Sequence, residues 1–243
     1  KAHVEPAGVA NVEQLTLHGA GLRLAGDPRL ELRNRSLGGE LRLAIPDLAP
    51  LRPAVGQPIA GALAIRAGLG GTVEIPEITL DGSVDRLAVA SEVIDRATLT
   101  GRVVGPLDAP SGTARLAATQ QRQELAVATG FKLADDLLSL TDLTLQAPAT
   151  RFAGNAEVVL SGLLARGSLS GGVSDLAALQ PWIGQPLSGA ANLNLTLATP
   201  GGRQDATLRA DARNVGGDFG TLQRVDLAAT LGDLMGRGAI GVD

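Results

Sequence analysis

The sequence contains no cysteine, so disulfide bonds and thiolate metal sites are both excluded for this chain. Aromatic residues are nearly absent as well, because three Phe, one Trp and no Tyr make up 2% of the 243 residues. Compact cores bury much of their area in aromatic side chains, so this chain must rely on Leu, Val, Ile and Ala. It also lacks any run of about 18 apolar residues, which excludes a transmembrane helix within this sequence.

Excess positive charge and catalytic patterns are missing too. The formal net charge is −4, whereas nucleic-acid binding needs clustered basic residues, so we expect no nucleic-acid partner. The histidines, His3 and His18, have no apparent ligand set, and the acids within residues 85–96 are spread along the chain. No nucleotide-binding loop, zinc-binding helix or nucleophile elbow occurs. We therefore expect no enzyme activity, no catalytic residue, no metal and no cofactor.

What the sequence does have is alternation of apolar and polar residues. In NLNLTL, for example, Leu193, Leu195 and Leu197 alternate with Asn and Thr, and QLTLHG, RLELRN, ELRLAI and LSLTDLTLQA follow the same pattern. Such alternation predicts strands with one apolar and one polar face, which is typical of antiparallel sheets. Gly-rich punctuation such as GLGG, LDGS and NVGGD predicts turns between about sixteen strands of roughly 5–9 residues.

The apolar positions of these strands are the main candidates for a ligand-binding surface. An ordinary sandwich core is the alternative, and periodicity alone does not separate the two. The candidate residues are Leu15, Leu17, Leu30, Leu32, Leu41, Leu43, Ile75, Leu80, Leu138, Leu140, Leu143, Leu145, Leu193, Leu195 and Leu197.

Two segments interrupt the alternation, and both are predicted to be short helices. They are IPDLAPLRPAVGQP, residues 45–58, and VSDLAALQPWIGQP, residues 173–186. In the second, Ser174 or Asp175 can cap the helix by accepting backbone N–H bonds, and the Gly and Pro of GQP can end it. Trp182 either packs this helix across the end of the sheet or contacts a lipid or partner protein.

The two interrupting segments belong to an internal repeat. Residues 47–69 align with 175–197 without a gap, and eleven of the 23 positions are identical. Beyond this stretch, an alignment shifted by one residue relates ATLTG to DLAATLG. The repeat units are therefore approximately 45–102 and 173–231, and a strand-rich connection, 103–172, joins them. We expect one elongated slice, 1–243, built from stacked units. The residues assigned to the repeated helix ends and the turns that follow them are Gly56, Pro58, Gly61, Gly184, Pro186 and Gly189.

The order of these motifs resembles a known family. SDLAALQPWIGQPLSGAANLNLTLATPGG, together with TLTGRVVGPLDAP and LTLQAPATRFAGNAEVVL, looks like the repeating segments of the TamB family, within the AsmA-like superfamily of bacterial envelope proteins. A Gly-Pro-Leu-x-x-Pro motif between strands also fits that family. In this sequence it consists of Gly105, Pro106, Leu107 and Pro110. The resemblance covers nearly the whole chain, but no N-terminal membrane helix is present in this sequence.

The resemblance implies a fold and a function. The fold would be all-β with short helical inserts, in which a long antiparallel sheet folds over as a β-taco with an apolar concave groove. The protein would lie in the periplasm, with its parent anchored in the inner membrane. It would bind phospholipid acyl chains, move phospholipid between the inner and outer membranes, and assist outer-membrane protein assembly with a TamA-like outer-membrane barrel. The alternatives are another AsmA-like lipid-transfer protein and an exported β-solenoid adhesin or structural segment.

Overall fold

A computed structural model gives the fold of the chain. It describes residues 2–4, 9–12, 15–19, 21–52, 58–89, 92–120, 123–180, 185–217, 220–233 and 239–242. The protein is all-β and antiparallel, with 76% of its residues in strands, and the described ranges contain no helix of seven or more residues. The expected fold class is confirmed at this level.

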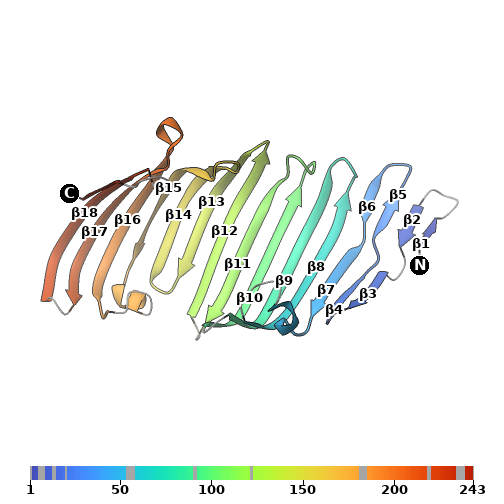
Figure 1. Cartoon of the computed structure of the whole chain (residues 1–243), viewed down its shortest axis with the longest axis horizontal. Coiled ribbons are helices and arrows are strands. Elements are labelled where there is room, and N and C mark those ends of the chain that lie inside the picture. The colour runs from blue at the N-terminus through green and yellow to red at the C-terminus, as the bar shows by residue number, and fades with distance from the viewer. Residues whose placement is uncertain are drawn as a thin grey trace. The chain divides into compact units, whose positions relative to one another are not determined.

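The chain divides into two compact units, Lys1–Glu124 and Leu125–Asp243, which are described separately here. In unit 1, a small sheet has the order β1-β2-β5-β6, and the main sheet has the order β11-β10-β9-β8-β7-β4-β3 (Figure 1). Its elements are β1 (Ala2–Val4), β2 (Val9–Val12), β3 (Leu15–Gly19), β4 (Leu22–Gly26), β5 (Arg29–Glu31), β6 (Ser36–Gly38), β7 (Glu40–Ile45), the 3-10 turn η1 (Ala49–Leu51), β8 (Ile59–Gly71), β9 (Pro76–Val89), β10 (Glu92–Val104) and β11 (Ser111–Gln120).

Unit 2 is a meander in which each strand pairs with the next strand along the chain. Its sheet has the order β19-β18-β17-β16-β15-β14-β13-β12. Its elements are β12 (Gln123–Ala134), β13 (Leu137–Ala147), β14 (Thr150–Val159), β15 (Leu164–Val173), the 3-10 turn η2 (Leu176–Leu179), β16 (Ser188–Ala198), the 3-10 turn η3 (Pro200–Gly202), β17 (Asp205–Gly217), β18 (Gly220–Gly232) and β19 (Ala239–Val242).

Many strands are longer than the sequence pattern predicted. β8, β10, β17 and β18 each have 13 residues and β9 has 14. The stretch LDGS, predicted to be a turn, lies in the middle of β9, where Gly82 pairs with Ile65 on one side and Leu99 on the other. A glycine between two large side chains relieves crowding there and does not turn the chain, so the turn prediction was wrong.

The two predicted helices are shorter than expected, because each contains only a 3-10 turn in the described residues. Asp175 accepts a hydrogen bond from the Ala177 backbone N–H at 2.9 Å, so this predicted cap is found. Asp47 makes the same bond to the Ala49 N–H, also at 2.9 Å. Gly56, Trp182 and Gly184 lie outside the described residues, whereas Pro58 and Pro186 lie just before β8 and β16.

Backbone irregularities also recur 128 residues apart. Both β8 and β16 have a bulge near their start, at Gly61 (φ 128°) and Gly189 (φ 107°). A side chain at Gly61 would place its Cβ 2.9 Å from the Arg86 carbonyl oxygen, so only glycine fits this approach. Arg86 and its counterpart Asn214 both have φ 51°. The bounds of β10 and β18 likewise differ by 128.

Candidate functional site

Strand register places the apolar side chains of unit 1 on one face of its main sheet. Directly paired residues share a face, and residues two apart along a strand do too. Followed from strand to strand, the residues named below share this face, and none of them is charged. Beyond Ala97 and Val84, the same alternation reaches Asp95 on β10 and Arg86 at the β9 bulge. The face comprises Leu15, Leu17, Leu22, Leu24, Gly26, Leu41, Leu43, Ile45, Leu63, Ile65, Ala67, Leu69, Ile78, Leu80, Gly82, Val84, Ala97, Leu99, Gly101, Val103, Gly112, Ala114, Leu116 and Ala118.

Unit 2 has an apolar face of the same kind. Two of the side chains named below as part of this face are polar, Thr129 and Thr150, and the Thr129 hydroxyl is 2.8 Å from the Gly130 carbonyl oxygen, to which it donates. Beyond Ala212 and Val225, the same alternation reaches Asn214 and Gln223. Together with the two threonines, the face comprises Leu125, Val127, Phe131, Leu133, Leu138, Leu140, Leu143, Leu145, Ala147, Phe152, Gly154, Ala156, Val158, Ala165, Gly167, Leu169, Gly171, Val173, Ala191, Leu193, Leu195, Leu197, Ala206, Leu208, Ala210, Ala212, Val225, Leu227, Ala229 and Leu231.

One irregularity is needed to keep the leucines of β13 together. Leu138 and Leu140 occupy even positions, whereas Leu143 and Leu145 occupy odd ones, so simple alternation would put them on opposite faces. A register shift between Leu140 and Leu143, with Asp142 at φ 51°, returns all four leucines to the apolar face.

Three predicted surface residues lie away from these faces. Leu30 belongs to β5 of the small sheet. Leu32 follows the end of β5 in a turn, so the strand expected through RLELRN stops at Glu31. Ile75 lies in the turn between β8 and β9. The other twelve predicted residues all belong to the two apolar faces, and nothing in the sequence pattern had pointed to Phe131, Phe152, Ile65 or Leu208.

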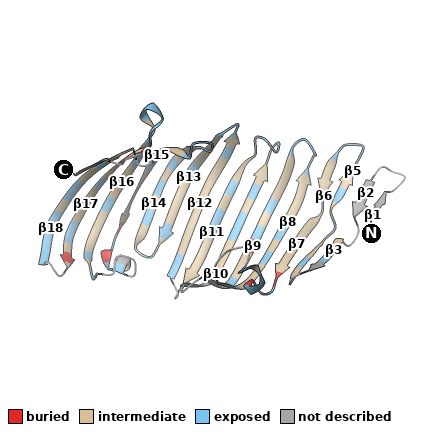
Figure 2. Cartoon of the chain, viewed as in Figure 1, coloured by how far each residue is buried: buried red, intermediate tan, exposed pale blue. Residues whose placement is uncertain are grey.

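The apolar faces are largely uncovered in the described structure. Figure 2 shows intermediate exposure over most of both sheets, with few buried positions. No large side chain among the described residues is fully buried, and the buried apolar residues are Ile45, Leu48, Val173, Leu176 and Ala206. A sandwich core would require a second layer over each face. The described residues of each unit contain no such layer.

Charged residues collect on the opposite face, where they form ion pairs across neighbouring strands. Arg66 lies 2.8 Å from Glu40, and Arg102 lies 2.8 Å from Glu77. These arginine side chains are at least 60% exposed, so water screens each pair and its contribution to stability is small. Their role is to keep one side of the sheet soluble while the other side stays largely free of charge.

Two carboxylates on this polar face are held ionised by their partners. A hydrogen bond from Arg42 lowers the pKa of Glu40, and Arg66 adds to the effect. A hydrogen bond from Arg224 lowers the pKa of Asp226 in the same way. A lowered pKa favours the permanently charged form, whereas a general acid or base needs a pKa near the working pH. Neither carboxylate is therefore tuned for proton transfer.

The described surface offers little else for chemistry. A shallow hollow of about 830 Å³ on the polar face of unit 2 is lined by Arg151, Ser170, Asn192, Asn194 and small residues. Within the described ranges, no three His, Asp or Glu side chains approach as metal ligands do. None of the helices that the structure describes is long and apolar enough to cross a bilayer.

No family model, no curated protein and no solved structure matches this chain.

Proposed function

We propose that this chain is a periplasmic segment of a TamB-like protein that binds acyl chains along its apolar faces. It would support phospholipid transport between the inner and outer membranes and, with a TamA-like barrel, outer-membrane protein assembly. In this proposal the sheet folds over as a β-taco whose concave wall is the apolar face. The structural features that recur 128 residues apart would mark copies of one unit.

One observation carries the proposal: the strand register collects uncharged side chains on a face that no described residue layer covers. Acyl chains have no hydrogen-bonding groups, so the surface that binds them needs continuous apolar area and no fixed polar contacts. Most of the apolar face of unit 1 has this composition, with Asp95 and Arg86 at its margin, and that of unit 2 contains two threonines, with Asn214 and Gln223 at its margin. Binding and sliding of this kind need no catalytic residue and no cofactor.

Photocrosslinking in cells tests the proposal. A photoreactive amino acid would replace Leu195 in one variant and its neighbour Asn194 in another, and covalently attached phospholipid would be measured. Leu195 belongs to the apolar face and Asn194 to the polar face of β16. Leu43 and Arg42 form the equivalent pair in unit 1.

We expect phospholipid on Leu195 and Leu43 and none on Asn194 and Arg42. No lipid at either leucine, in protein that is folded normally, would overturn the proposal and leave a spacer or partner-binding role. Crosslinking of the same variants to a TamA-like barrel would separate the TamB-like assignment from another AsmA-like lipid-transfer protein.

A further inference from the structure

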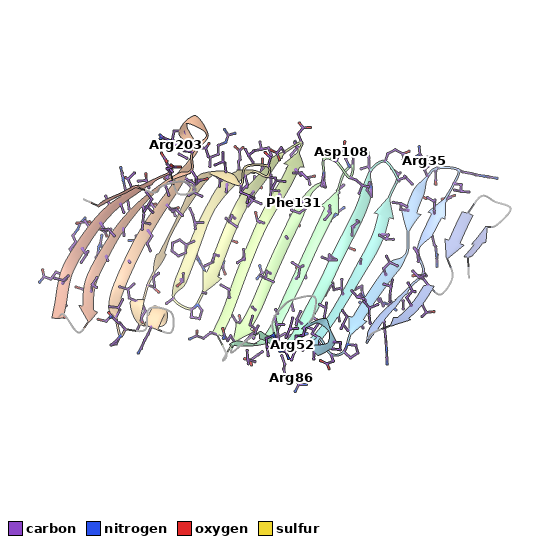
Figure 3. All side chains as sticks on the ribbon, viewed as in Figure 1. Arg35, Arg52, Arg86, Asp108, Phe131 and Arg203 are labelled. Atoms are coloured by element: carbon purple, nitrogen blue, oxygen red, sulfur yellow. The ribbon has the colours of Figure 1, made fainter. Side chains whose placement is uncertain are left out.

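The two edges of each apolar face differ in how far they are covered. In both units, a turn with a buried leucine covers one edge, and the other edge has no comparable cover in the described residues. We call the strand ends beside η1 and η2 the insert edge. The opposite strand ends, at turns 72–75 and 105–110 of unit 1 and 160–163 and 199–204 of unit 2, form the far edge. Figure 3 shows Arg52 and Arg86 at the insert edge of unit 1, and Arg35 and Asp108 at its far edge.

At the insert edge, the turn after one strand covers the end of the apolar face. In unit 1, Leu48 of the insert and Ile45 at the end of β7 are both buried, with 5% and 6% exposed. The Leu48 backbone N–H donates to the Gly61 carbonyl at 2.9 Å, which fixes the insert against the start of β8. In unit 2, Leu176 and Val173 occupy the equivalent positions and are also buried.

This cover is local to the strands that flank each insert. Val93, which lies at the insert edge two strands away from η1, is exposed. The argument therefore concerns β7 and β8 in unit 1, and β15 and β16 in unit 2.

The far edge of unit 1 has no comparable cover in the described residues. Leu69, Ile78 and Val103, the last large residues of the apolar face on this side, are only half-buried. Beyond them the turns expose Ile75, at 56%, and Leu107, at 84%. The apolar surface thus continues outward at this edge.

Unit 2 repeats the arrangement. Leu138 and Val158 are half-buried near the far edge, and the turn beyond them exposes Leu160 and Leu163. Ala206, which pairs with Leu197 and Leu231, is buried near this edge.

The distance between the two edges matches the length of a lipid tail. Leu63 and Leu69 lie six residues apart on β8, which corresponds to about 20 Å at ~3.4 Å per residue. A bilayer has a hydrocarbon core of ~30 Å, so one leaflet's acyl chain occupies about 15 Å. A whole acyl chain can therefore lie along the strands within the apolar face.

We propose that lipid lies on this face with its acyl ends toward the insert edge and its headgroup at the far edge. This inference rests on the proposed function and adds an orientation to it. Charged side chains occur at both edges, so charge does not set the orientation. The apolar cover does, because buried Leu48 or Leu176 already occupies the end of the face at the insert edge, and a headgroup placed against it would lose its water.

The absence of cysteine makes a direct test possible. Single cysteines would replace Leu63 or Leu69 on β8, and their counterparts Ala191 or Leu197 on β16, in the whole chain. Each would carry an environment-sensitive fluorophore. Phosphatidylcholine vesicles would contain lipid with a nitroxide quencher either on the headgroup or near the end of one acyl chain.

We expect the headgroup nitroxide to quench Leu69→Cys at least about twofold more than Leu63→Cys, because the two positions lie ~20 Å apart. The acyl-end nitroxide should give the reverse order, and the pair on β16 should behave alike. Equal quenching at both ends of the strand, or the opposite order, would overturn the orientation while leaving lipid binding intact. No quenching by either lipid, in variants with unchanged circular dichroism, would instead overturn the proposed function.

Discussion

Gln204 shows how a single side chain can replace a missing strand. It is the buried polar residue of the described chain, with 7% exposed. Its Oε1 accepts from the Ala165 N–H at 2.6 Å, and its Nε2 donates to the Ala165 carbonyl at 2.9 Å. β16 ends at Ala198, so its pairing with β15 stops at Gly167. The Gln204 amide therefore satisfies backbone groups of β15 that would otherwise lack a partner.

Replacing Gln204 with Leu should therefore destabilise the protein. The change leaves the Ala165 N–H and carbonyl without these bonds, and the expected loss in the free energy of unfolding is about 1–3 kcal/mol. Urea denaturation measures it. Gln146→Leu is the matched control, because Gln146 is exposed on β13, and its effect should stay within about 0.5 kcal/mol. Equal effects from the two substitutions would contradict the role assigned to Gln204.

At the scale of the strand, the bulge at Asp142 decides which face the β13 leucines occupy. Deleting Asp142 should force either Leu138 and Leu140 or Leu143 and Leu145 onto the polar face, because a one-residue shift reverses every side chain. We expect a loss of ~2–4 kcal/mol in unfolding free energy, from two leucines that leave the apolar face. Urea denaturation again gives the value.

The control for this deletion keeps the chain length. Asp142→Gly preserves the bulge, and glycine adopts the positive φ of this position without strain. Its effect should stay within about 1 kcal/mol. If the deletion proved as mild as the substitution, the register of β13 would not depend on the bulge.

The strands themselves show what the sequence could and could not predict. Alternation predicted an all-β fold with antiparallel strands, and it placed Leu41, Leu43 and Leu195 on apolar faces. It could not predict the bulge between Leu140 and Leu143, because a bulge changes the phase of the pattern and depends on the partner strand. Gly82 was misassigned to a turn because glycine in a strand interior and glycine in a turn look alike without the neighbouring strands.

At the scale of the whole molecule, most of the apolar area predicted to be a core or a binding surface is exposed to solvent. Periodicity records only which residues share a face, whereas exposure depends on a covering layer that alternation does not encode. The small buried clusters around Ile45 and Val173 were likewise unexpected. They form where the inserts fold back, and the predicted caps were the only sign of them.

The difference in exposure between the apolar face and the buried clusters can be tested by introducing a charged side chain at each. Leu195→Asp should lower the free energy of unfolding by only about 1–2 kcal/mol, because its half-buried side chain keeps access to water. Leu176→Asp, at a position only 8% exposed, should cost about 4 kcal/mol or more. Thermal denaturation followed by circular dichroism compares the two variants, with Asn194→Asp as the polar-face control. If Leu195→Asp destabilised the protein as much as Leu176→Asp in thermal denaturation, the apolar face around Leu195 would have to be covered.

Pairing between sequence neighbours has a consequence for how the chain acquires its structure. In unit 2 every strand pairs with the strand before it and the strand after it, so loops that must be closed are short. Folds dominated by such local contacts form rapidly, and all-β proteins are slow mainly when distant segments must meet. Each hairpin of unit 2 can therefore add to the growing edge in the order of the sequence, and assembly need not wait for the end of the chain.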